Sequence, residues 1–256
     1  MKDSKPDIFT EGHIRISHFN IRFNRNNVLN MIDCYPDSPI YEETIEEYEK
    51  LAAEAYEIIA PAAILRYGKV KPQLGSNGYR TCEPACYVIY TVGNKITELS
   101  GHYFSKGDYL AAMLIDAMAN DYLSQMDDVI TDLIYQQCKQ MKTGVLKRLD
   151  PPSDIPLEAQ KIILEETGAA KEWDLGITEG YMFTAVKTNC YVLILTEDEN
   201  KFEARHDCAK CNLPDCKMRK TVKLEVICDN QTYTVNHRKT DNVLETLIKN
   251  GFQLSA

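Results

Sequence analysis

The sequence lacks an apolar run long enough to cross a bilayer. Its longest apolar stretches, Ile58 to Leu65 and Tyr191 to Leu195, have the length of single secondary-structure elements, whereas a membrane-spanning helix needs about 20 apolar residues. The N-terminal segment MKDSKPDIFTEGH also lacks the apolar centre of a secretory signal peptide. We therefore expect a cytoplasmic protein with no membrane partner.

Positive charge is in deficit, and histidine is sparse. The chain has 29 basic and 38 acidic residues, a formal net charge of −9. An acidic chain repels phosphate, so we expect no nucleic-acid partner. There is no phosphate-binding loop and no serine–histidine–aspartate motif. The histidines are scattered through the sequence, at His13, His18, His102, His206 and His237. We therefore find no candidate general base or nucleophile.

The composition is otherwise that of a globular protein. Hydrophobic residues make up 44% and charged residues 26% of 256 residues, which favours one large domain or two unequal ones. Apolar residues recur at helical spacing over 41–59 and 109–138, and Asp108 is the expected N-cap of the second helix. Strand patterns occur at 13–19, 85–91, 176–186, 189–196, 222–228 and 232–235, and 95–99 has the pattern of a hairpin return strand. A proline-rich loop is expected over 148–156, and short helices are expected over 157–166 and 242–250.

Cysteine is abundant, with nine residues. Cys208, Cys211 and Cys216 form a C-x2-C-x4-C pattern in a polar, lysine-rich segment. Thiolates at such spacing bind iron–sulfur clusters or structural zinc, and nearby cations lower thiol pKa values. A 4Fe–4S cluster would need a fourth ligand, such as Cys190, Cys228 or a non-protein group, whereas His206 would complete a zinc site. The remaining alternative is three surface thiols without a metal.

Three segments resemble the activation domain of vitamin B12-dependent methionine synthase, in a stand-alone form. They are GDYLAAMLIDAMANDYLSQM (107–126), RLDPPSDIPLEAQKIILEETGA (148–169) and LGITEGYMFTAVKTNCY (175–191). The resemblance implies an α+β fold in which long helices pack on an antiparallel sheet. It also implies a role in returning inactive cobalamin, held by a partner corrinoid protein or cobalamin-dependent methyltransferase, to its active state.

The second segment is similar to the family's Arg-x-x-Pro-Gly-Tyr-Pro loop, which contacts S-adenosylmethionine. Arg148 and Pro151 match that pattern, but Pro152 replaces the glycine and Ser153 replaces the tyrosine. Proline adds bulk and removes an N–H donor, so this departure weighs against S-adenosylmethionine binding. Arg148, Asp108 and Glu179 are the candidate contacts. Their alternative roles are a loop ion pair, a helix N-cap and a solvent-facing strand residue.

The tail from Val222 to Ala256 is similar to the start of a plant-type 2Fe–2S module in reductive activators of corrinoid proteins, a β-grasp fold. The chain ends where that module's cysteine ligands would begin, so we expect a partial module. The expected organisation is an activation-like domain (1–204), a cysteine-rich metal loop (205–220) and a partial β-grasp tail (221–256).

Three functions fit these patterns. The first is an accessory protein that passes electrons through an iron–sulfur cluster to a corrinoid on a partner methyltransferase. The second is an S-adenosylmethionine-binding activation component of methionine synthase. The third is a zinc-stapled binding module without a redox role.

Overall fold

The chain divides into two compact units, Met1–Arg205 and His206–Ala256. The computed structural model describes residues 12–77, 83–206, 208, 216, 217, 219, 221–228 and 231–238. The helix expected over 242–250 and the cysteines Cys82 and Cys211 lie outside these residues. The assignment of 1–204 as an activation-like domain, of 205–220 as a metal loop and of 221–256 as a partial β-grasp tail stays a prediction.

The first unit contains six α-helices, one 3-10 helix and five strands among its described residues. In chain order they are β1 (Gly12–Ile16), α1 (Arg25–Met31), α2 (Tyr41–Ile58), β2 (Ala62–Lys69), η1 (Pro72–Asn77), β3 (Pro84–Thr91), α3 (Lys95–Ser105), α4 (Tyr109–Met141), β4 (Gly144–Leu149), α5 (Ala159–Thr167), α6 (Ala169–Glu172) and β5 (Thr188–Thr196).

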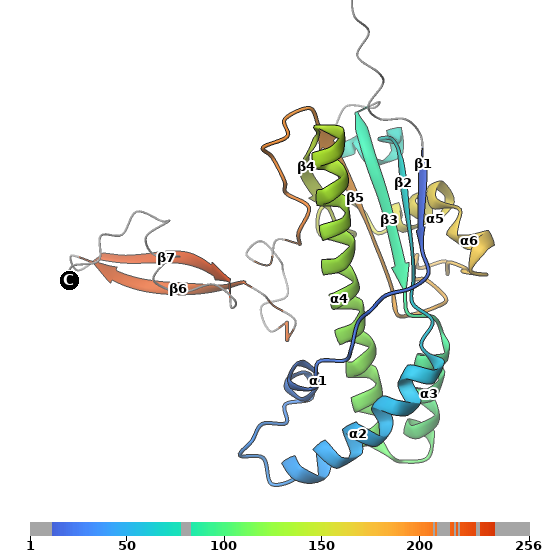
Figure 1. Ribbon diagram of the computed structural model, residues 1–256, viewed down its shortest axis with the longest axis vertical. Coiled ribbons are helices and arrows are strands. Elements are labelled where there is room, and N and C mark those ends of the chain that lie inside the picture. The colour runs from blue at the N-terminus through green and yellow to red at the C-terminus, as the bar shows by residue number, and fades with distance from the viewer. Residues whose placement is uncertain are drawn as a thin grey trace, which may run out of the picture. The chain divides into compact units, whose positions relative to one another are not determined.

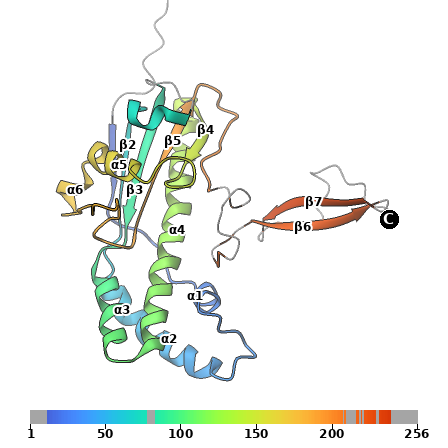
Figure 2. The same ribbon diagram turned by 180° about the vertical axis from the view of Figure 1, so that it is seen from behind.

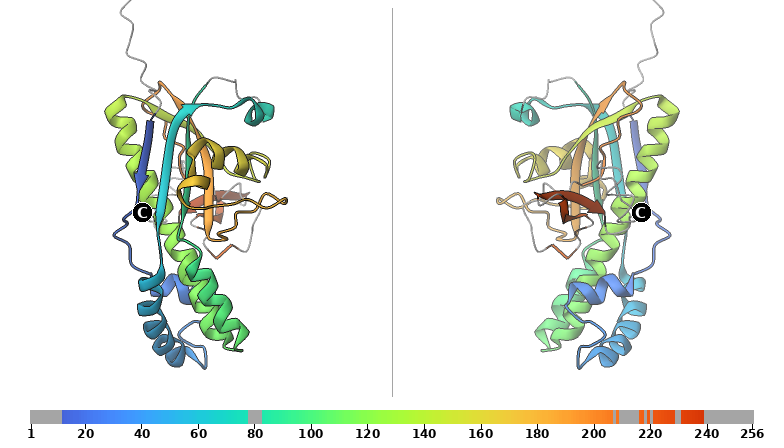
Figure 3. Two further views of the ribbon diagram at one scale, coloured as in Figure 1. Left: turned by 90° about the vertical axis from the view of Figure 1, so that its right-hand side faces the viewer. Right: turned by 90° about the vertical axis from the view of Figure 1, so that its left-hand side faces the viewer.

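The five strands form one antiparallel sheet in the order β1-β2-β3-β5-β4. Helix α4 covers one face of this sheet, while α5 and α6 cover the other (Figure 3). Each face has its own apolar core, because successive residues of a strand point to opposite sides. In β5, Tyr191, Leu193 and Leu195 face α4, and Cys190, Val192 and Ile194 lie in the core with α5. The α+β class with an antiparallel sheet and long helices is confirmed.

Helix α4 has 33 residues, a length of about 50 Å at 1.5 Å per residue. The expected cap is confirmed: the Asp108 carboxylate accepts a hydrogen bond from the Ala111 N–H at 3.2 Å. Its first turns extend beyond the sheet, where they pack with α2 and α3 (Figure 1). The helix ends at Lys142, which adopts the left-handed conformation.

A fully buried carboxylate joins α4 to the segment that leads into α1. The side chain of Asp121 accepts hydrogen bonds from the Asn24 N–H at 2.7 Å and the Asn27 amide at 2.9 Å. It also accepts one from the Gln125 side chain at 2.8 Å. Each of these donors offsets part of the cost of removing a charge from water.

Three expectations about local structure were wrong. Residues 95–99 do not form a hairpin strand but begin α3, since Ile96, Leu99 and Tyr103 recur at helical spacing and pack against the core under α4. Residues 176–186 form an irregular loop with one bridge, between Ile177 and Phe183. Arg148 lies in β4 rather than at the start of a loop.

The second unit contains an antiparallel hairpin of β6 (Thr221–Cys228) and β7 (Gln231–Arg238). These two strands agree with those expected over 222–228 and 232–235. Among the described residues, no helix combines the length and the apolar character that a membrane span requires.

Candidate functional site

A β-bulge in β4 decides which way Arg148 points. The pairing with β5 places Val145 opposite Leu195 and Arg148 opposite Leu193, with one extra residue, Leu146, between the paired positions. Because a bulge adds a residue to one strand only, it shifts the alternation of side chains by one. Val145 and Arg148 therefore face α4 together, although an unbroken strand would turn Lys147 to that face.

The chain segment after β5 completes the walls around Arg148. The Val145 N–H donates to the Lys201 carbonyl at 2.9 Å, and the Glu203 N–H donates to the Val145 carbonyl at 3.0 Å. This parallel pairing needs a close approach at Gly144, where a Cβ would lie 2.1 Å from the Asp198 carbonyl oxygen. As a result, the Ala204 carbonyl comes within 3.4 Å of the Arg148 guanidinium.

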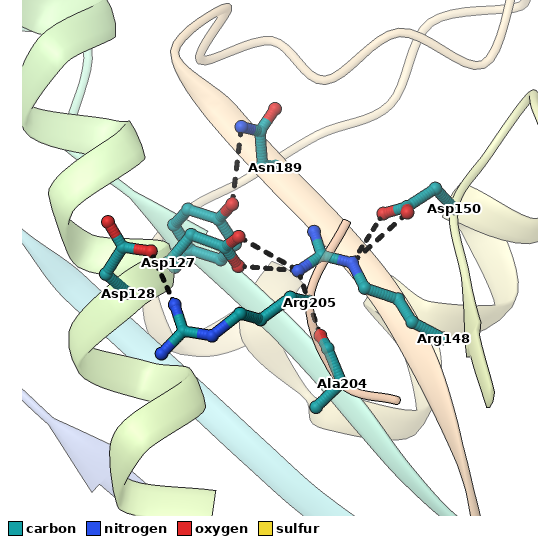
Figure 4. Close-up of polar contacts among 8 residues, drawn as sticks. Asp127, Asp128, Arg148, Asp150, Asn189, Ala204 and Arg205 are labelled. Carbon is teal, nitrogen blue, oxygen red and sulfur yellow. Dashed lines mark hydrogen bonds and ion pairs between the residues drawn. The ribbon is translucent and has the colours of Figure 1, made fainter. Parts of the chain in front are cut away.

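Arg148 is held by two carboxylates from different parts of the chain (Figure 4). Its Nη1 donates to both oxygens of Asp127, on α4, at 2.9 Å. Its Nε donates to both oxygens of Asp150, just after β4, at 2.9 and 3.1 Å. The guanidinium carbon lies 3.6 Å from the centre of the Tyr191 ring. Among the described residues, Nη2 has no hydrogen-bond partner.

The electrostatics of this group follow from its burial, since only 7% of the Arg148 side chain is exposed. Burial by itself lowers the pKa of Arg148, but Asp127, Tyr191 and Asp150 raise it, and the net direction is well above the ordinary value. The two carboxylates therefore stabilise the charged guanidinium inside the protein.

Two buried tyrosines lie next to Arg148 and its two carboxylate partners. Tyr191 and Tyr90 are buried, with ring centres 6.2 Å apart in an edge-to-face arrangement. Burial, reinforced by the nearby Asp127 carboxylate, raises the pKa of both hydroxyls. The Tyr191 hydroxyl is buried without a hydrogen-bond partner among the described residues. Unsatisfied buried hydroxyls are uncommon in native proteins.

The residues that depart from the Arg-x-x-Pro-Gly-Tyr-Pro pattern lie at the surface. Pro152 and Ser153 are exposed, and Pro151 is half-buried. The loop is tied to β4 by an ion pair between Lys147 and Asp154 at 3.0 Å. The loop position next to Arg148 therefore carries neither the glycine backbone nor the tyrosine ring of the family pattern.

The three candidate ligand contacts, Arg148, Asp108 and Glu179, are not gathered at one point. Asp108 caps α4, and Asp127 lies 19 residues along the same helix, about 28 Å away at 1.5 Å per residue. Glu179 is exposed on the loop between α6 and β5. Asp108 and the partners of Arg148 are thus too far apart to contact one small molecule together. The ligand roles of the three residues stay predictions.

The cysteine-rich segment is described at Cys208 and Cys216. Cys208 is buried, Cys216 is half-buried, and both are free thiols. Arg219 connects them, because its N–H donates to the Cys216 carbonyl at 3.0 Å and its guanidinium donates to the Cys208 carbonyl. One arginine therefore contacts the backbones of both cysteines. No cluster of three metal-ligand side chains occurs among the described residues, of which Cys211 is not one.

The other buried cysteines of the first unit pack in its cores. Cys138 belongs to α4 and shares a core with Cys86 and Cys34, while Cys190 lies on the opposite face of the sheet. Burial raises the thiol pKa of Cys86, Cys138 and Cys190, which opposes formation of the thiolate that a metal needs. These positions indicate that Cys86 and Cys138 are packing residues, and they disfavour Cys190 as a fourth ligand.

Sequence reasoning missed the partners of Arg148. Asp127 comes from α4, Tyr191 from β5 and Ala204 from the segment after it, and these contacts depend on the sheet order. One signal was present: an Asp-Asp pair at 127–128 interrupts the apolar pattern of a long helix. Such an interruption indicates carboxylates that need partners.

The fold and the Arg148 cluster define an α+β protein with a buried arginine–carboxylate centre between its long helix and its sheet. No family model matches the chain, and no curated protein matches it. Among solved structures it is similar to the MetH reactivation domain bound to AdoHcy, with a TM-score of 0.49 and 9% sequence identity. That similarity covers 77% of this chain and 82% of the other.

Proposed function

We propose that this protein takes part in the reductive activation of cobalamin held by a partner corrinoid protein or cobalamin-dependent methyltransferase. The observation that carries the proposal is the convergence of the three segments that resemble the methionine synthase activation domain. The Lys187 ammonium contacts Asp116 at 2.7 Å and Asn120 at 2.8 Å, which joins the third segment to the first. Arg148 stacks on Tyr191 at 3.6 Å, which joins the second segment to the third.

The same segments share one apolar core. Leu149, Ile155 and Ile163 of the second segment pack with Leu175 and Phe183 of the third, on the sheet face that α5 covers (Figure 2). Residues that are far apart in sequence and resemble one family at three places thus form a single structural unit. This supports the proposal that the resemblance reflects a shared architecture.

The cysteine loop is the proposed redox element. Cys208, Cys211 and Cys216 would hold an iron–sulfur cluster, which, when bound, supplies one-electron redox chemistry. Arg219 fits this role because it bonds to the backbones of Cys208 and Cys216 and adds a positive charge beside the thiolates. The chain's own part is to hold these thiolates together and to dock on the corrinoid partner.

Metal analysis of anaerobically purified full-length protein tests this proposal. We expect a brown protein that contains iron and acid-labile sulfide, and a Cys211→Ala variant that loses both. A Cys34→Ala variant is the matched control, since Cys34 is a buried packing residue of the first unit, and should keep its iron. A colourless protein with one zinc per chain would instead support the zinc-stapled module.

Binding of S-adenosylmethionine is the second candidate function. One observation favours it: the Nη2 of Arg148 has no hydrogen-bond partner among the described residues, and a guanidinium nitrogen can donate to a ligand carboxylate. Isothermal titration calorimetry of the full chain measures this directly. Micromolar affinity that is lost in Arg148→Lys would support the activation-component role, because lysine cannot reproduce the guanidinium fork. Absence of a binding heat at millimolar S-adenosylmethionine would contradict this second candidate function.

A further inference from the structure

A second site lies in the first unit, and its lining does not include Arg148 or the partners of Arg148. It is a cavity of about 920 Å³ at the end of the sheet where β1 ends and β2 begins. Its volume falls within the roughly 300–1,000 Å³ that small-molecule sites occupy. Its lining comes from separate parts of the chain and includes Phe19, Tyr56, Ala60, Tyr122, Trp173 and Asp174.

Aromatic side chains form much of the wall. Phe19 and Tyr122 are buried, and the Tyr122 hydroxyl donates to the Phe19 carbonyl at 3.4 Å. Trp173 is half-buried and packs against the core on the α5 side. Aromatic faces at the border of two packed cores are held in place, so a flat ligand can stack on them at little entropic cost.

The polar groups of the wall carry one sign of charge. Among the described residues that line the cavity, Asp174 is the only carboxylate, and none is a lysine or an arginine. His18, Asn94 and Thr184 supply further hydrogen-bonding groups. An anionic ligand would therefore meet repulsion without a compensating cation, whereas a positive charge would be attracted by Asp174 and by the indole face of Trp173.

Backbone hydrogen bonds fix the segment that presents these groups. The Trp173 N–H donates to the Ala169 carbonyl at 2.9 Å, and the Leu175 N–H donates to the Ala170 carbonyl at 3.1 Å. Asp174, between them, adopts the left-handed conformation with φ of 51°. The far wall is held by the Thr184 N–H, which donates to the Gly176 carbonyl at 3.0 Å. The site is thus built before any ligand arrives.

We propose that this cavity binds a planar heteroaromatic molecule of nucleoside size that carries a positive charge or none. The ring stacks among the aromatic side chains, and the Asp174 carboxylate accepts a hydrogen bond from an amino group or pairs with a ring cation. The proposal is independent of the Arg148 group, because none of Arg148, Asp127, Asp150 and Tyr191 lines the cavity.

The single tryptophan makes the test direct, since Trp173 is the only tryptophan in the chain. The full-length protein is titrated with 1-methyladenosine, adenosine and adenosine 5′-monophosphate, which share the adenine ring system. At neutral pH the first is positive through N1 methylation of the ring, the second is neutral, and the third is negative through its phosphate. We expect a saturable change of tryptophan emission with the first two and none with the third. The cation should bind about three- to tenfold more tightly than adenosine.

Two variants separate binding in the cavity from collisional quenching. Asp174→Asn keeps the left-handed backbone, which asparagine tolerates, and should abolish the preference for the cation while adenosine still binds. Ala60→Leu narrows the cavity and should weaken both ligands at least tenfold. Equal responses to all three ligands, a response that never saturates, or unchanged affinity in Ala60→Leu would each overturn the proposal.

Discussion

Two arginines bind aspartates of the same helix in opposite surroundings. Arg148 contacts Asp127 at 2.9 Å with 7% of its side chain exposed, while Arg205 contacts the adjacent Asp128 at 3.0 Å with 44% exposed. The chemistry of the two pairs is the same, so burial alone separates them. An exposed pair is screened by water, whereas a buried charge that loses its partner has no solvent to replace it. Only the Arg148 pair is therefore expected to determine stability.

The largest effect should come from removing Arg148. In Arg148→Ala the Asp127 carboxylate, only 17% exposed, loses its guanidinium partner, and we expect a loss of about 3–5 kcal/mol in the free energy of unfolding. Urea unfolding followed by circular dichroism measures it. Replacing the pair with apolar residues, in Arg148→Met with Asp127→Leu, should recover part of the loss. A loss below about 1 kcal/mol in Arg148→Ala would contradict the claim that the buried Arg148 pair stabilises the fold more than the exposed Arg205 pair does.

Asp121 extends the comparison to a fully buried carboxylate that accepts hydrogen bonds from three neutral donors within 2.9 Å. Asp121→Ala removes the acceptor of these hydrogen bonds. We expect a loss of about 2–3 kcal/mol, smaller than for Arg148 because these three donors are uncharged. Asp121→Asn is the control and should lose less, since its side-chain oxygen still accepts. Equal losses in the two variants would show that packing, rather than hydrogen bonding, holds the segment before α1.

Buried thiols should make the free energy of unfolding depend on pH. Cys86 lies in the core on the α4 face of the sheet, and Cys190 lies in the core on the opposite face. Burial raises the pKa of Cys86 and Cys190, so the folded state favours the protonated thiol. This stabilisation is complete below the unfolded-state pKa of about 8.5 and decreases as pH rises above it, by at most about 1.4 kcal/mol per pH unit for each thiol. Urea midpoints between pH 8 and 10 should fall, and less steeply in Cys86→Ala. A flat profile in that range contradicts the prediction.

The smallest effect is expected at Arg205. It contacts Asp128 and Asp132 at 3.0 and 2.9 Å, but all three side chains are well exposed. Arg205→Ala should change the free energy of unfolding by less than about 1 kcal/mol, and the difference should shrink further at high salt. Thermal unfolding with and without added salt measures both quantities. A salt-independent loss as large as that of Arg148→Ala would contradict the role given to burial.

Local features of this fold could be predicted from sequence, and contacts between distant segments could not. The N-cap at Asp108 and the extents of α2 and β3 depend on neighbouring residues, so composition and periodicity were enough. Strand β4 was missed because its six residues include Lys147 and Arg148 and a bulge at Leu146, which destroys the alternation of a strand. Helix α3 was misread because Gly93-Asn94 is also a hairpin signal.

The candidate site shows the same limit. The family resemblance singled out Arg148, but not the carboxylates and the ring that hold it, since Asp127 and Tyr191 reach it only through the sheet order β3-β5-β4 and the docking of α4. The resemblance also grouped Asp108 and Glu179 with Arg148. The length of α4 separates Asp108 from the partners of Arg148, a distance that no short motif contains.

Delivery of an electron to a corrinoid tests the central claim most directly. The full-length protein, reduced with titanium(III) citrate under argon and then desalted, is mixed with hydroxocobalamin, and the corrin spectrum is followed. We predict conversion of cobalt(III) to cobalt(II) with one electron per cluster, at a rate at least tenfold above that of Cys211→Ala. Equal rates for the two proteins would contradict an electron-transfer role for the cysteine loop.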